Sequence, residues 1–378
     1  MLALQGIPKN INEPLLGKIS FFSTEKDNRS ETIIVDPKLS KRKLKSYVAS
    51  IFSCIDIDDQ LKTSGIPIVY NVNNIHLLSE GDVVEILPNG LINVFYQINS
   101  KHNLIFVTSR CNSNCIMCPQ LIDNNEGNLL DLNLKLISLI DKSTEELALT
   151  GGEPTVIGHD LFHLILACKH YLPNTSLLLL TNARKFSDLK YTHLFSSLGH
   201  PNITIAITLY GDNNIEHDFI AGSKDAFNEM VRGILNLATF GNSIEIRIVI
   251  HKYTYKGLLR ISEYIYRNMV FVKHIAFMGL ETTWRAKANL ELLWVEPKEI
   301  INSLEESIRY LAQRGMNLSI YNIPLCLLPK NLWKFARQSI SGWKNSFDSK
   351  CLTCSVKNQC SGMFESGVPV YSQYLQPI

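Results

Sequence analysis

Three closely spaced cysteines constrain this chain more than any other feature of its sequence. Cys111, Cys115 and Cys118 form a C-x3-C-x2-C loop directly after residues 104–107, a short apolar run typical of a buried strand. Structural zinc requires four ligands, whereas a cubane 4Fe–4S cluster held by three cysteines keeps one iron open to a ligand that is not protein. The loop therefore predicts a site-differentiated 4Fe–4S cluster. A redox-inert cluster or a zinc loop is the alternative interpretation.

A glycine-rich turn forms the second motif. Gly151, Gly152, Glu153 and Pro154 follow a second predicted strand at residues 146–149. About one βαβ crossover, roughly 30 residues, separates this turn from Cys118, so both loops should lie on the same rim of a parallel sheet. Glycines without a Cβ let the backbone approach a ligand closely enough to hydrogen-bond an amino group. A lone Gly-Gly pair is usually only a turn, so this prediction depends on the neighbouring cysteine loop.

From residue 103 onward, strand and helix patterns alternate, which predicts parallel strands with crossover helices. The predicted strands are residues 104–107, 146–149, 176–180, 203–207, 244–250 and 272–278, and helices are predicted at 132–139 and 159–170. Six such units predict an α/β fold, a partial (β/α)6 TIM-like barrel whose active site lies at the carboxyl ends of the strands. Cys168 lies on the apolar face of its helix and is expected in the core.

The first hundred residues differ from the rest in pattern. Short β-like runs occur at 66–70, 82–87 and 91–96, and Pro88-Asn89-Gly90 joins the last two as a hairpin. Residues 41–52 predict an amphipathic helix with a basic face, and Cys54 is expected in the core. An exposed hairpin edge in this module could accept an extended peptide as an added strand, and a merely structural cap on the base of the barrel is the alternative interpretation.

A second group of cysteines lies near the end of the chain. Cys351, Cys354 and Cys360 have C-x2-C-x5-C spacing, and Cys326 precedes them. Four thiolates complete the ligand set of either a closed 4Fe–4S cluster or a structural zinc ion, and the count does not choose the metal. The resulting domain prediction is a β-rich module at 1–100, a barrel at 101–322 and a metal-binding region at 323–378.

Composition limits the possible partners. The chain has 378 residues, 46% hydrophobic and 19% charged, which is typical of a globular protein with a sizeable core. A net charge of +2 is too close to neutral to predict nucleic acid or an anionic membrane as the main partner. We expect no secretory signal and no membrane span. Nine cysteines in a chain this large favour reduced, metal-binding thiolates and a cytoplasmic location.

Both central motifs resemble those of the radical S-adenosylmethionine enzymes. In that family, the amino and carboxylate groups of S-adenosylmethionine chelate the open iron, and reductive cleavage yields a 5′-deoxyadenosyl radical. The resemblance implies that the Gly151–Pro154 turn contacts the methionine amine. It also implies that Thr208 lies near the nucleoside, that Arg247 pairs with the methionine carboxylate and that residues 279–281 contact adenine. His217 is a candidate for acid–base chemistry or a structural histidine.

The distal cysteines resemble the auxiliary-cluster extensions of peptide-modifying radical enzymes. The whole layout, including residues 81–84 and 336–344, resembles the C-type maturase of the His-Xaa-Ser system. This resemblance implies a small precursor peptide as substrate, a partner radical maturase and an electron donor such as flavodoxin or ferredoxin.

Three hypotheses about function follow. The first is a radical S-adenosylmethionine enzyme that modifies a ribosomally made peptide. The second is a non-catalytic iron–sulfur or zinc scaffold, or an electron-transfer partner, that serves another maturase. The third is a radical enzyme that acts on a small molecule. The Gly-Gly-Glu-Pro turn favours an enzyme, because a scaffold has no use for a methionine-binding loop.

Overall fold

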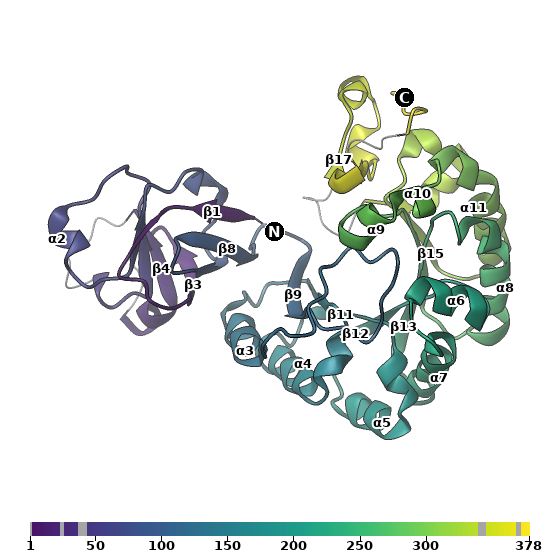
Figure 1. Cartoon of the computed structure of the whole chain (residues 1–378), viewed down its shortest axis with the longest axis horizontal. Coiled ribbons are helices and arrows are strands. Elements are labelled where there is room, and N and C mark those ends of the chain that lie inside the picture. The colour runs from purple at the N-terminus through teal and green to yellow at the C-terminus, as the bar shows by residue number, and fades with distance from the viewer. Residues whose placement is uncertain (1, 23–25, 37–43, 339–344, 368–371) are drawn as a thin grey trace. The chain divides into compact units, whose positions relative to one another are not determined.

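The computed structural model describes residues 2–22, 26–36, 44–338, 345–367 and 372–378 (Figure 1). These residues form two compact units: residues 1–105, 129–147 and 163–175 make the first, and residues 106–128, 148–162 and 176–378 make the second. The C-terminal region therefore belongs to the same unit as most of the barrel. The three-domain division predicted from the sequence stays a prediction.

The first unit contains a small β-sheet of eight strands in the order β1-β8-β7-β3-β4-β5-β6-β2. The strands are β1 (Ala3–Gln5), β2 (Ile7–Lys9), β3 (Leu15–Ser20), β4 (Thr32–Val35), β5 (Ala49–Ile51), β6 (Ile68–Tyr70), β7 (Val83–Ile86) and β8 (Leu91–Tyr96). The predicted hairpin is present, since β7 and β8 pair antiparallel and Gly90 adopts φ +82° in the turn. The short helix α2 (Asp59–Lys62) precedes β6.

Three expectations about this unit are wrong. The outermost strands β1 and β2 are consecutive pieces of one segment broken only at Gly6, and they pair with β8 and β6, so the sheet closes on itself. Among the described strands, the expected free hairpin edge is therefore not found. Residues 49–51 form a strand and not the end of a helix, because Ala49 and Ile51 are fully buried between β4 and β6; residues 41–43 of that predicted helix lie outside the described residues. Cys54 is exposed.

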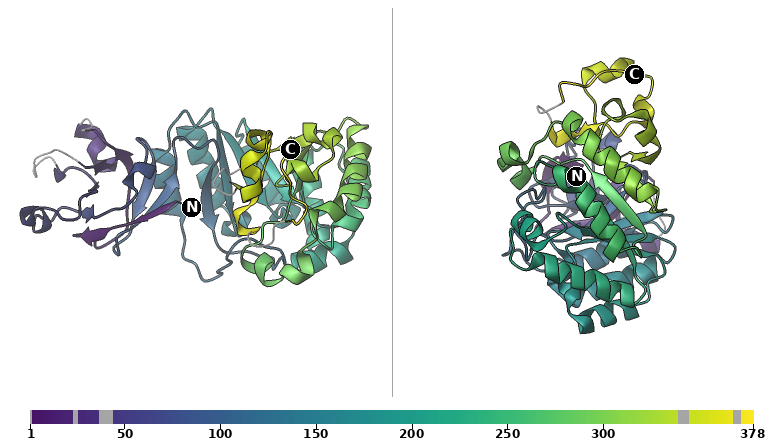
Figure 2. Two further views of the ribbon diagram at one scale, coloured as in Figure 1. Left: turned by 90° about the horizontal axis from the view of Figure 1, so that it is seen from above. Right: turned by 90° about the vertical axis from the view of Figure 1, so that its right-hand side faces the viewer.

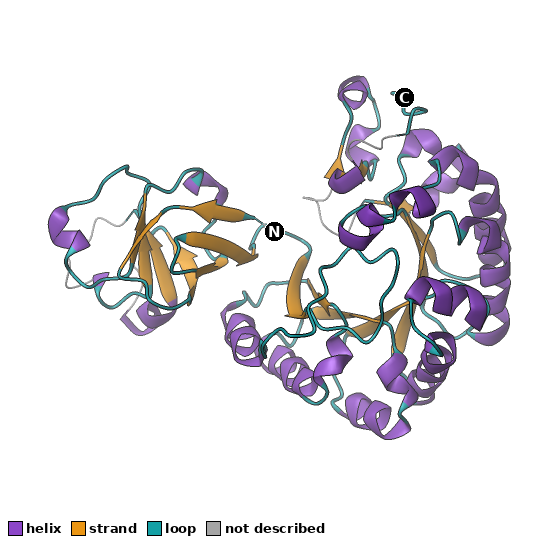
Figure 3. Cartoon of the chain, in the orientation of Figure 1, coloured by secondary structure: helices purple, strands orange, loops and turns teal. Residues whose placement is uncertain are grey.

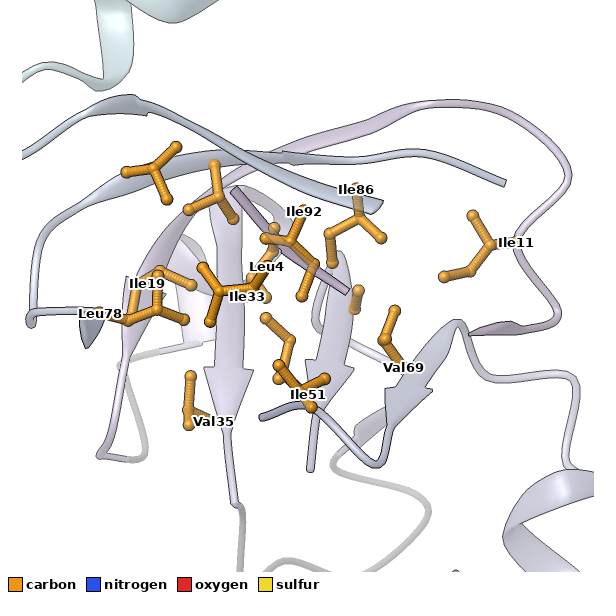
Figure 4. Packing of buried hydrophobic residues seen from close by; sticks show 14 residues of the cluster. Leu4, Ile11, Ile19, Ile33, Val35, Ile51, Val69, Leu78, Ile86 and Ile92 are labelled. Atoms are coloured by element: carbon orange, nitrogen blue, oxygen red, sulfur yellow. The ribbon is translucent and has the colours of Figure 1, made fainter. Parts of the chain in front are cut away.

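Aliphatic side chains fill the interior of this sheet (Figure 4). Ile19, Ile33 and Ile51 come from neighbouring strands and are fully buried together with Ile92 from the hairpin. β-branched side chains pack well on a pleated surface, which explains why such short strands hold together.

The barrel sheet also has eight strands, in the order β16-β15-β14-β13-β12-β11-β10-β9, and the pairs from β11 to β16 are parallel. All six predicted strands are present: β9 (Asn103–Thr108), β10 (Glu146–Gly151), β11 (Ser176–Thr181), β12 (Ile203–Thr208), β13 (Ser243–Val249) and β14 (His274–Met278). Two shorter strands, β15 (Leu318–Tyr321) and β16 (Ala336–Arg337), extend the sheet beyond the predicted six.

Helices cover the outer side of these strands (Figures 1 and 3), and the right-hand view of Figure 2 looks onto this helical layer. The helices are α3 (Leu130–Leu139), α4 (Asp160–Tyr171), α5 (Leu189–Ser197), α6 (Asn214–Ala221), α7 (Ala226–Thr239), α8 (Leu258–Asn268), α9 (Trp284–Ala288), α10 (Leu290–Leu293) and α11 (Pro297–Ala312). The predicted helices at 132–139 and 159–170 correspond to α3 and α4, and Cys168 is buried as expected.

The C-terminal region consists mainly of 3-10 turns. These include η6 (Leu325–Leu327), η7 (Lys330–Phe335), η9 (Ser349–Thr353) and η10 (Lys357–Gln359), and a short hairpin pairs β17 (Asn345–Ser346) with β18 (Met363–Phe364). Residues 339–344 of the segment quoted for the maturase resemblance lie outside the described residues. Along the part of the chain that the structure describes, no helix has the length and apolar character needed to cross a membrane.

Candidate functional site

The cysteine loop has no regular structure of its own and depends on contacts from other elements. Asn114 and Ile116 donate backbone hydrogen bonds to Ala221 and Ile220, the last turn of α6, both at 2.9 Å. At the start of the loop, Cys111 N–H donates to Asn124 Oδ1 at 3.0 Å. The cysteines are therefore presented from a backbone that is fixed at both ends.

Arg184, in the 3-10 turn after β11, holds the middle of the loop. Its Nη1 donates to Asn112 O at 2.5 Å and to Ser113 Oγ at 3.0 Å. The same guanidinium contacts Ser223 Oγ at 2.7 Å and forms an ion pair with Glu229 on α7. A single cation thus joins the cysteine loop to two other segments of the barrel.

The other side of the loop is held by residues around α9. Arg285 donates to Asn114 O at 3.1 Å, Asn289 Nδ2 donates to Ile116 O at 2.9 Å, and Thr283 Oγ1 donates to Pro119 O at 2.9 Å. These three side chains satisfy loop carbonyls that have no strand or helix partner.

The three loop cysteines are free, partly buried thiols. Burial raises the pKa of Cys111 to about 11 and that of Cys115 to about 12, and burial also raises the pKa of Cys118. The charges of neighbouring loop cysteines also raise the pKa of Cys111 and of Cys115, which places these thiols in one electrostatic environment. Thiolates in this setting need a nearby positive charge, such as iron, to become the stable form.

The glycine turn lies directly against the start of the cysteine loop. Gly152 N–H donates to Thr108 O at 2.7 Å, and Glu153 N–H donates to Arg110 O at 2.9 Å. A Cβ on Gly151 would lie 2.2 Å from Thr108 O, and a Cβ on Gly152 would lie 2.3 Å from Arg110 O. Both glycines are therefore required by backbone-to-backbone packing of the two predicted site loops.

The side chain of Glu153 points into the protein and not toward the rim. Its Oε1 accepts hydrogen bonds from Thr155 N–H at 3.0 Å, Thr155 Oγ1 at 2.7 Å and Thr181 Oγ1 at 2.6 Å. Its Oε2 accepts one from Asn182 N–H at 2.6 Å. The carboxylate thus joins the ends of β10 and β11, and Pro154 is buried beside it at the start of a 3-10 turn.

Thr208 and Arg247 are neighbours in the parallel register of β12 and β13. Arg247 alternates with buried Ile246 and Ile248, as predicted, and its Nε donates to Glu245 Oε1 at 2.6 Å. Glu245 also contacts His274 Nδ1 at 2.8 Å. The structure therefore shows Arg247 paired with a carboxylate of this chain; its contact with a methionine carboxylate stays a prediction.

Gly279 and Leu280, the expected adenine contacts, line a pocket of about 520 Å³ at the carboxyl ends of β13 to β15. Its walls are mainly apolar and include Trp294 and Phe364. Buried Asn322 adds one polar side chain.

Two residues near the cysteines were missed or only partly anticipated from the sequence. Tyr210, just after β12, donates its hydroxyl to Cys115 Sγ at 3.6 Å. His217 is buried on α6, and its Nδ1 accepts the Tyr210 backbone N–H at 3.3 Å. Burial lowers the pKa of His217 to about 4, which favours the neutral form of its imidazole. The sequence offered one signal for Tyr210. It lies two residues after Thr208, and side chains two residues apart along an extended strand point to the same face.

The distal cysteines converge on one pocket. Cys326, Cys351, Cys354 and Cys360 all line a cavity of about 400 Å³ together with Phe347, Val356, Met363 and Leu375. The Sγ of Cys360 accepts hydrogen bonds from Leu325 N–H at 3.3 Å and Gly362 N–H at 3.4 Å. Burial raises the pKa of Cys326 and of Cys351, and the neighbouring thiols act in the same direction.

Within the described residues, no three or more His, Cys, Asp or Glu side chains are grouped so that they could hold a single metal ion. The donor chemistry of both cysteine groups fits an iron–sulfur cluster, since each group consists of thiols only. The three cysteines of the loop match a cubane cluster with one open iron, and the four distal cysteines match a fully ligated one.

Solved structures provide the comparison with known proteins. No protein-family model matches the chain, and no curated protein matches it. Streptococcus suis SuiB bound to S-adenosylmethionine matches with a TM-score of 0.51 and 15% identity over 73% of this chain and 75% of that chain. SuiB bound to precursor peptide SuiA gives a TM-score of 0.46 and 17% identity, covering 58% of this chain and 48% of that one. Native anSMEcpe with bound AdoMet gives a TM-score of 0.46 and 17% identity, covering 57% of this chain and 62% of that chain.

These matches concern the fold. The matched part spans about half the length of peptide-bound SuiB. Together with the parallel strand order, the likeness to the S-adenosylmethionine-bound protein confirms the predicted fold class, a partial α/β barrel.

Proposed function

We propose that this protein is a radical S-adenosylmethionine enzyme. The observation that carries the proposal is the pairing of Cys111, Cys115 and Cys118 with the Gly151–Gly152 turn, which packs backbone-to-backbone against their loop at the carboxyl edge of the sheet. Active sites of α/β barrels form at this edge. A cluster with three protein thiolates supplies one open iron and one-electron reduction there.

The chain's own residues have distinct tasks in this proposal. The three cysteines hold the cluster, and Arg184 and Arg285 keep their loop in one conformation. The backbone of the glycine turn would contact the methionine amine, and Thr208 and Arg247, on neighbouring strands, would contact the nucleoside and the carboxylate. The Glu153 side chain serves the site indirectly, because it fixes the turn and does not face the ligand.

Release of 5′-deoxyadenosine tests the proposal. Anaerobically reconstituted protein with a strong reductant and S-adenosylmethionine should release 5′-deoxyadenosine, and a variant with all three loop cysteines replaced by Ala should release none. The matched control replaces Cys168, a buried thiol on α4, by Ala and should keep activity. A wild-type protein with a loaded, reduced cluster that releases no 5′-deoxyadenosine would contradict the enzyme hypothesis.

We further propose a second, closed 4Fe–4S cluster in the pocket lined by Cys326, Cys351, Cys354 and Cys360. Four thiols around one cavity and two backbone N–H donors to the Cys360 sulfur support it. The variant lacking Cys111, Cys115 and Cys118 should retain about one cluster, that is, roughly four irons per chain. Zinc without iron in that variant would favour the structural-zinc alternative.

The substrate we propose is a ribosomally made precursor peptide, of the His-Xaa-Ser type implied by the sequence resemblance, with a partner radical maturase and a flavodoxin or ferredoxin as electron donor. SuiB, whose barrel has the same fold, has been crystallised with its precursor peptide. Mass analysis of a co-expressed precursor should show a mass change that depends on the loop cysteines. An unchanged precursor beside active 5′-deoxyadenosine release would favour a small-molecule substrate.

A non-catalytic scaffold or electron-transfer protein remains the second candidate. The pocket lined by the distal cysteines is as compatible with an electron-transfer protein as with an enzyme, since thiolate-only ligation suits electron relay. The two candidates differ in one measurement, because a scaffold binds iron but does not cleave S-adenosylmethionine.

A further inference from the structure

Tyr210 directs a hydroxyl group at one of the three loop cysteines. It lies just after β12, its side chain is buried, and its O–H donates to Cys115 Sγ at 3.6 Å. The Thr208 hydroxyl bonds the same phenol group from two residues earlier. The Tyr210 hydroxyl reaches Cys115 Sγ from outside the cysteine loop. By contrast, Cys111 Sγ accepts its hydrogen bond from Ser113 N–H within the loop.

The ring of Tyr210 is held on several sides. Its backbone N–H donates to His217 Nδ1 at 3.3 Å, and the two rings pack with centroids 5.2 Å apart. The His217 ring in turn packs against Phe227 at 5.7 Å. Met117 and Ile220 belong to the same buried cluster as Tyr210. This packing leaves the hydroxyl little freedom to turn away from Cys115.

We propose that the Tyr210 hydroxyl raises the reduction potential of the cluster bound by Cys111, Cys115 and Cys118. The inference rests on the proposed function for the identity of that metal centre. When an external one-electron reductant reduces the cluster, negative charge on its thiolate sulfurs increases. An O–H dipole aimed at one sulfur stabilises this more negative state more than the oxidised state, since hydrogen bonds to sulfur are among the factors that set cluster potentials.

Tyr210→Phe is a precise test, because it removes the hydroxyl and keeps the ring that packs on His217. Tyr191→Phe is the matched control: Tyr191 is also buried in this unit, and its hydroxyl donates to Gly158 O at 3.3 Å, away from the cysteine loop. The midpoint potential is measured by anaerobic dithionite titration followed by EPR, without S-adenosylmethionine. The loop cluster is identified as the one whose EPR signal changes when S-adenosylmethionine is added afterwards.

We expect Tyr210→Phe to make reduction about tenfold less favourable, a shift of about 59 mV to more negative potential for one electron. Tyr191→Phe should keep the wild-type potential, and all three proteins should have the same iron content. An unchanged or more positive potential in a fully loaded Tyr210→Phe protein would overturn the inference and leave the proposed function intact. A wild-type protein that takes up no cluster at the loop would overturn both.

A second measurement uses the wild-type protein, so it does not depend on the variant folding well. Proton ENDOR of the reduced loop cluster in H₂O and D₂O should show an exchangeable hydrogen-bonded proton, and Tyr210 labelled with deuterium on its ring carbons should add a weak deuterium coupling. Absence of ring deuterium coupling would show that the phenol does not lie against the cluster and would overturn the inference.

Discussion

The buried carboxylate of Glu153 offers the sharpest test of how the site is built. Its two oxygens each accept one backbone N–H, Thr155 N–H on Oε1 and Asn182 N–H on Oε2. Glu153→Gln replaces one acceptor by an NH₂ donor, and neither orientation of the amide can accept both N–H groups. One backbone donor is then left unsatisfied in a position that is 1% exposed, which costs about 1–3 kcal/mol.

Glu153→Ala should be worse, because it leaves both backbone donors without an acceptor, a loss of roughly 2–6 kcal/mol before any cavity is counted. Urea unfolding followed by tryptophan fluorescence is a suitable assay. Of the four tryptophans, Trp284, Trp294 and Trp333 lie in the described part of the second compact unit, as does Glu153. With a slope of about 2–3 kcal/mol/M, the Gln variant should unfold at a urea concentration lower by roughly 0.3–1.5 M.

Glu306→Gln on α11 is the control, since Glu306 is exposed and such changes usually stay within about 0.5 kcal/mol. If Glu153→Gln unfolds at the same urea concentration as this control, the carboxylate does not hold the two loops together. A Glu153→Ala protein no less stable than Glu153→Gln would also contradict this role of the carboxylate.

The remaining predictions concern the same rim. Arg184→Met should lose iron from the loop cluster faster than wild type during anaerobic gel filtration, because Asn112 O and Ser113 Oγ lose their common donor; equal retention would contradict this. Gly152→Ala should lower stability by about 1–3 kcal/mol or more, since its Cβ meets a loop carbonyl at 2.3 Å, whereas Gly127→Ala, with open space around it, should stay near wild type in the same urea assay. Burial lowers the pKa of His251 to about 4 from 6.5, so the unfolded chain binds this proton more tightly and stability is lost as the pH falls from 6.5 toward 4. The loss is at most about 3 kcal/mol, and His251→Gln should flatten the dependence of the urea midpoint on pH in that range; an unchanged slope would refute the assignment.

The parts of the fold that the sequence predicted well were those with strong local signals. Asn89-Gly90 predicts its hairpin because both residues tolerate positive φ, and the structure has Gly90 at φ +82°. The six barrel strands were predictable because each is a short apolar run followed by a helical pattern. The motif loops could be placed side by side because consecutive parallel strands end at one edge.

The wrong or missed predictions concern very short strands and features that depend on contacts between residues far apart in the sequence. Residues 49–51 have a helix-compatible pattern, but Ala49 and Ile51 are fully buried where β5 pairs with β4 and β6, and this tertiary contact decides their conformation. β15 and β16 were missed as barrel strands because they are only four and two residues long. The closure of the small sheet through Gly6 depends on pairing between the two ends of the sheet, which no local pattern records.

The site residues divide in the same way. The cysteines and glycines stand out as motifs, whereas Arg184 lies more than 70 residues from Asn112 and Ser113, the loop residues that it binds, and one arginine among many carries no signal. The inward direction of Glu153 was also not readable, because it depends on donors from Thr181 and Asn182 at the end of the next strand.

The cysteine loop is held by hydrogen bonds from several other elements. It bonds to α6, Arg184 and Arg285 through backbone and side-chain atoms. Contacts of this kind reduce the conformational entropy that the loop loses when it binds a cluster. The raised pKa values of Cys111 and Cys115 act in the opposite direction, because their protons must leave when iron binds. Buried thiols this close together therefore favour their neutral form until a positively charged centre compensates the charge of the thiolates.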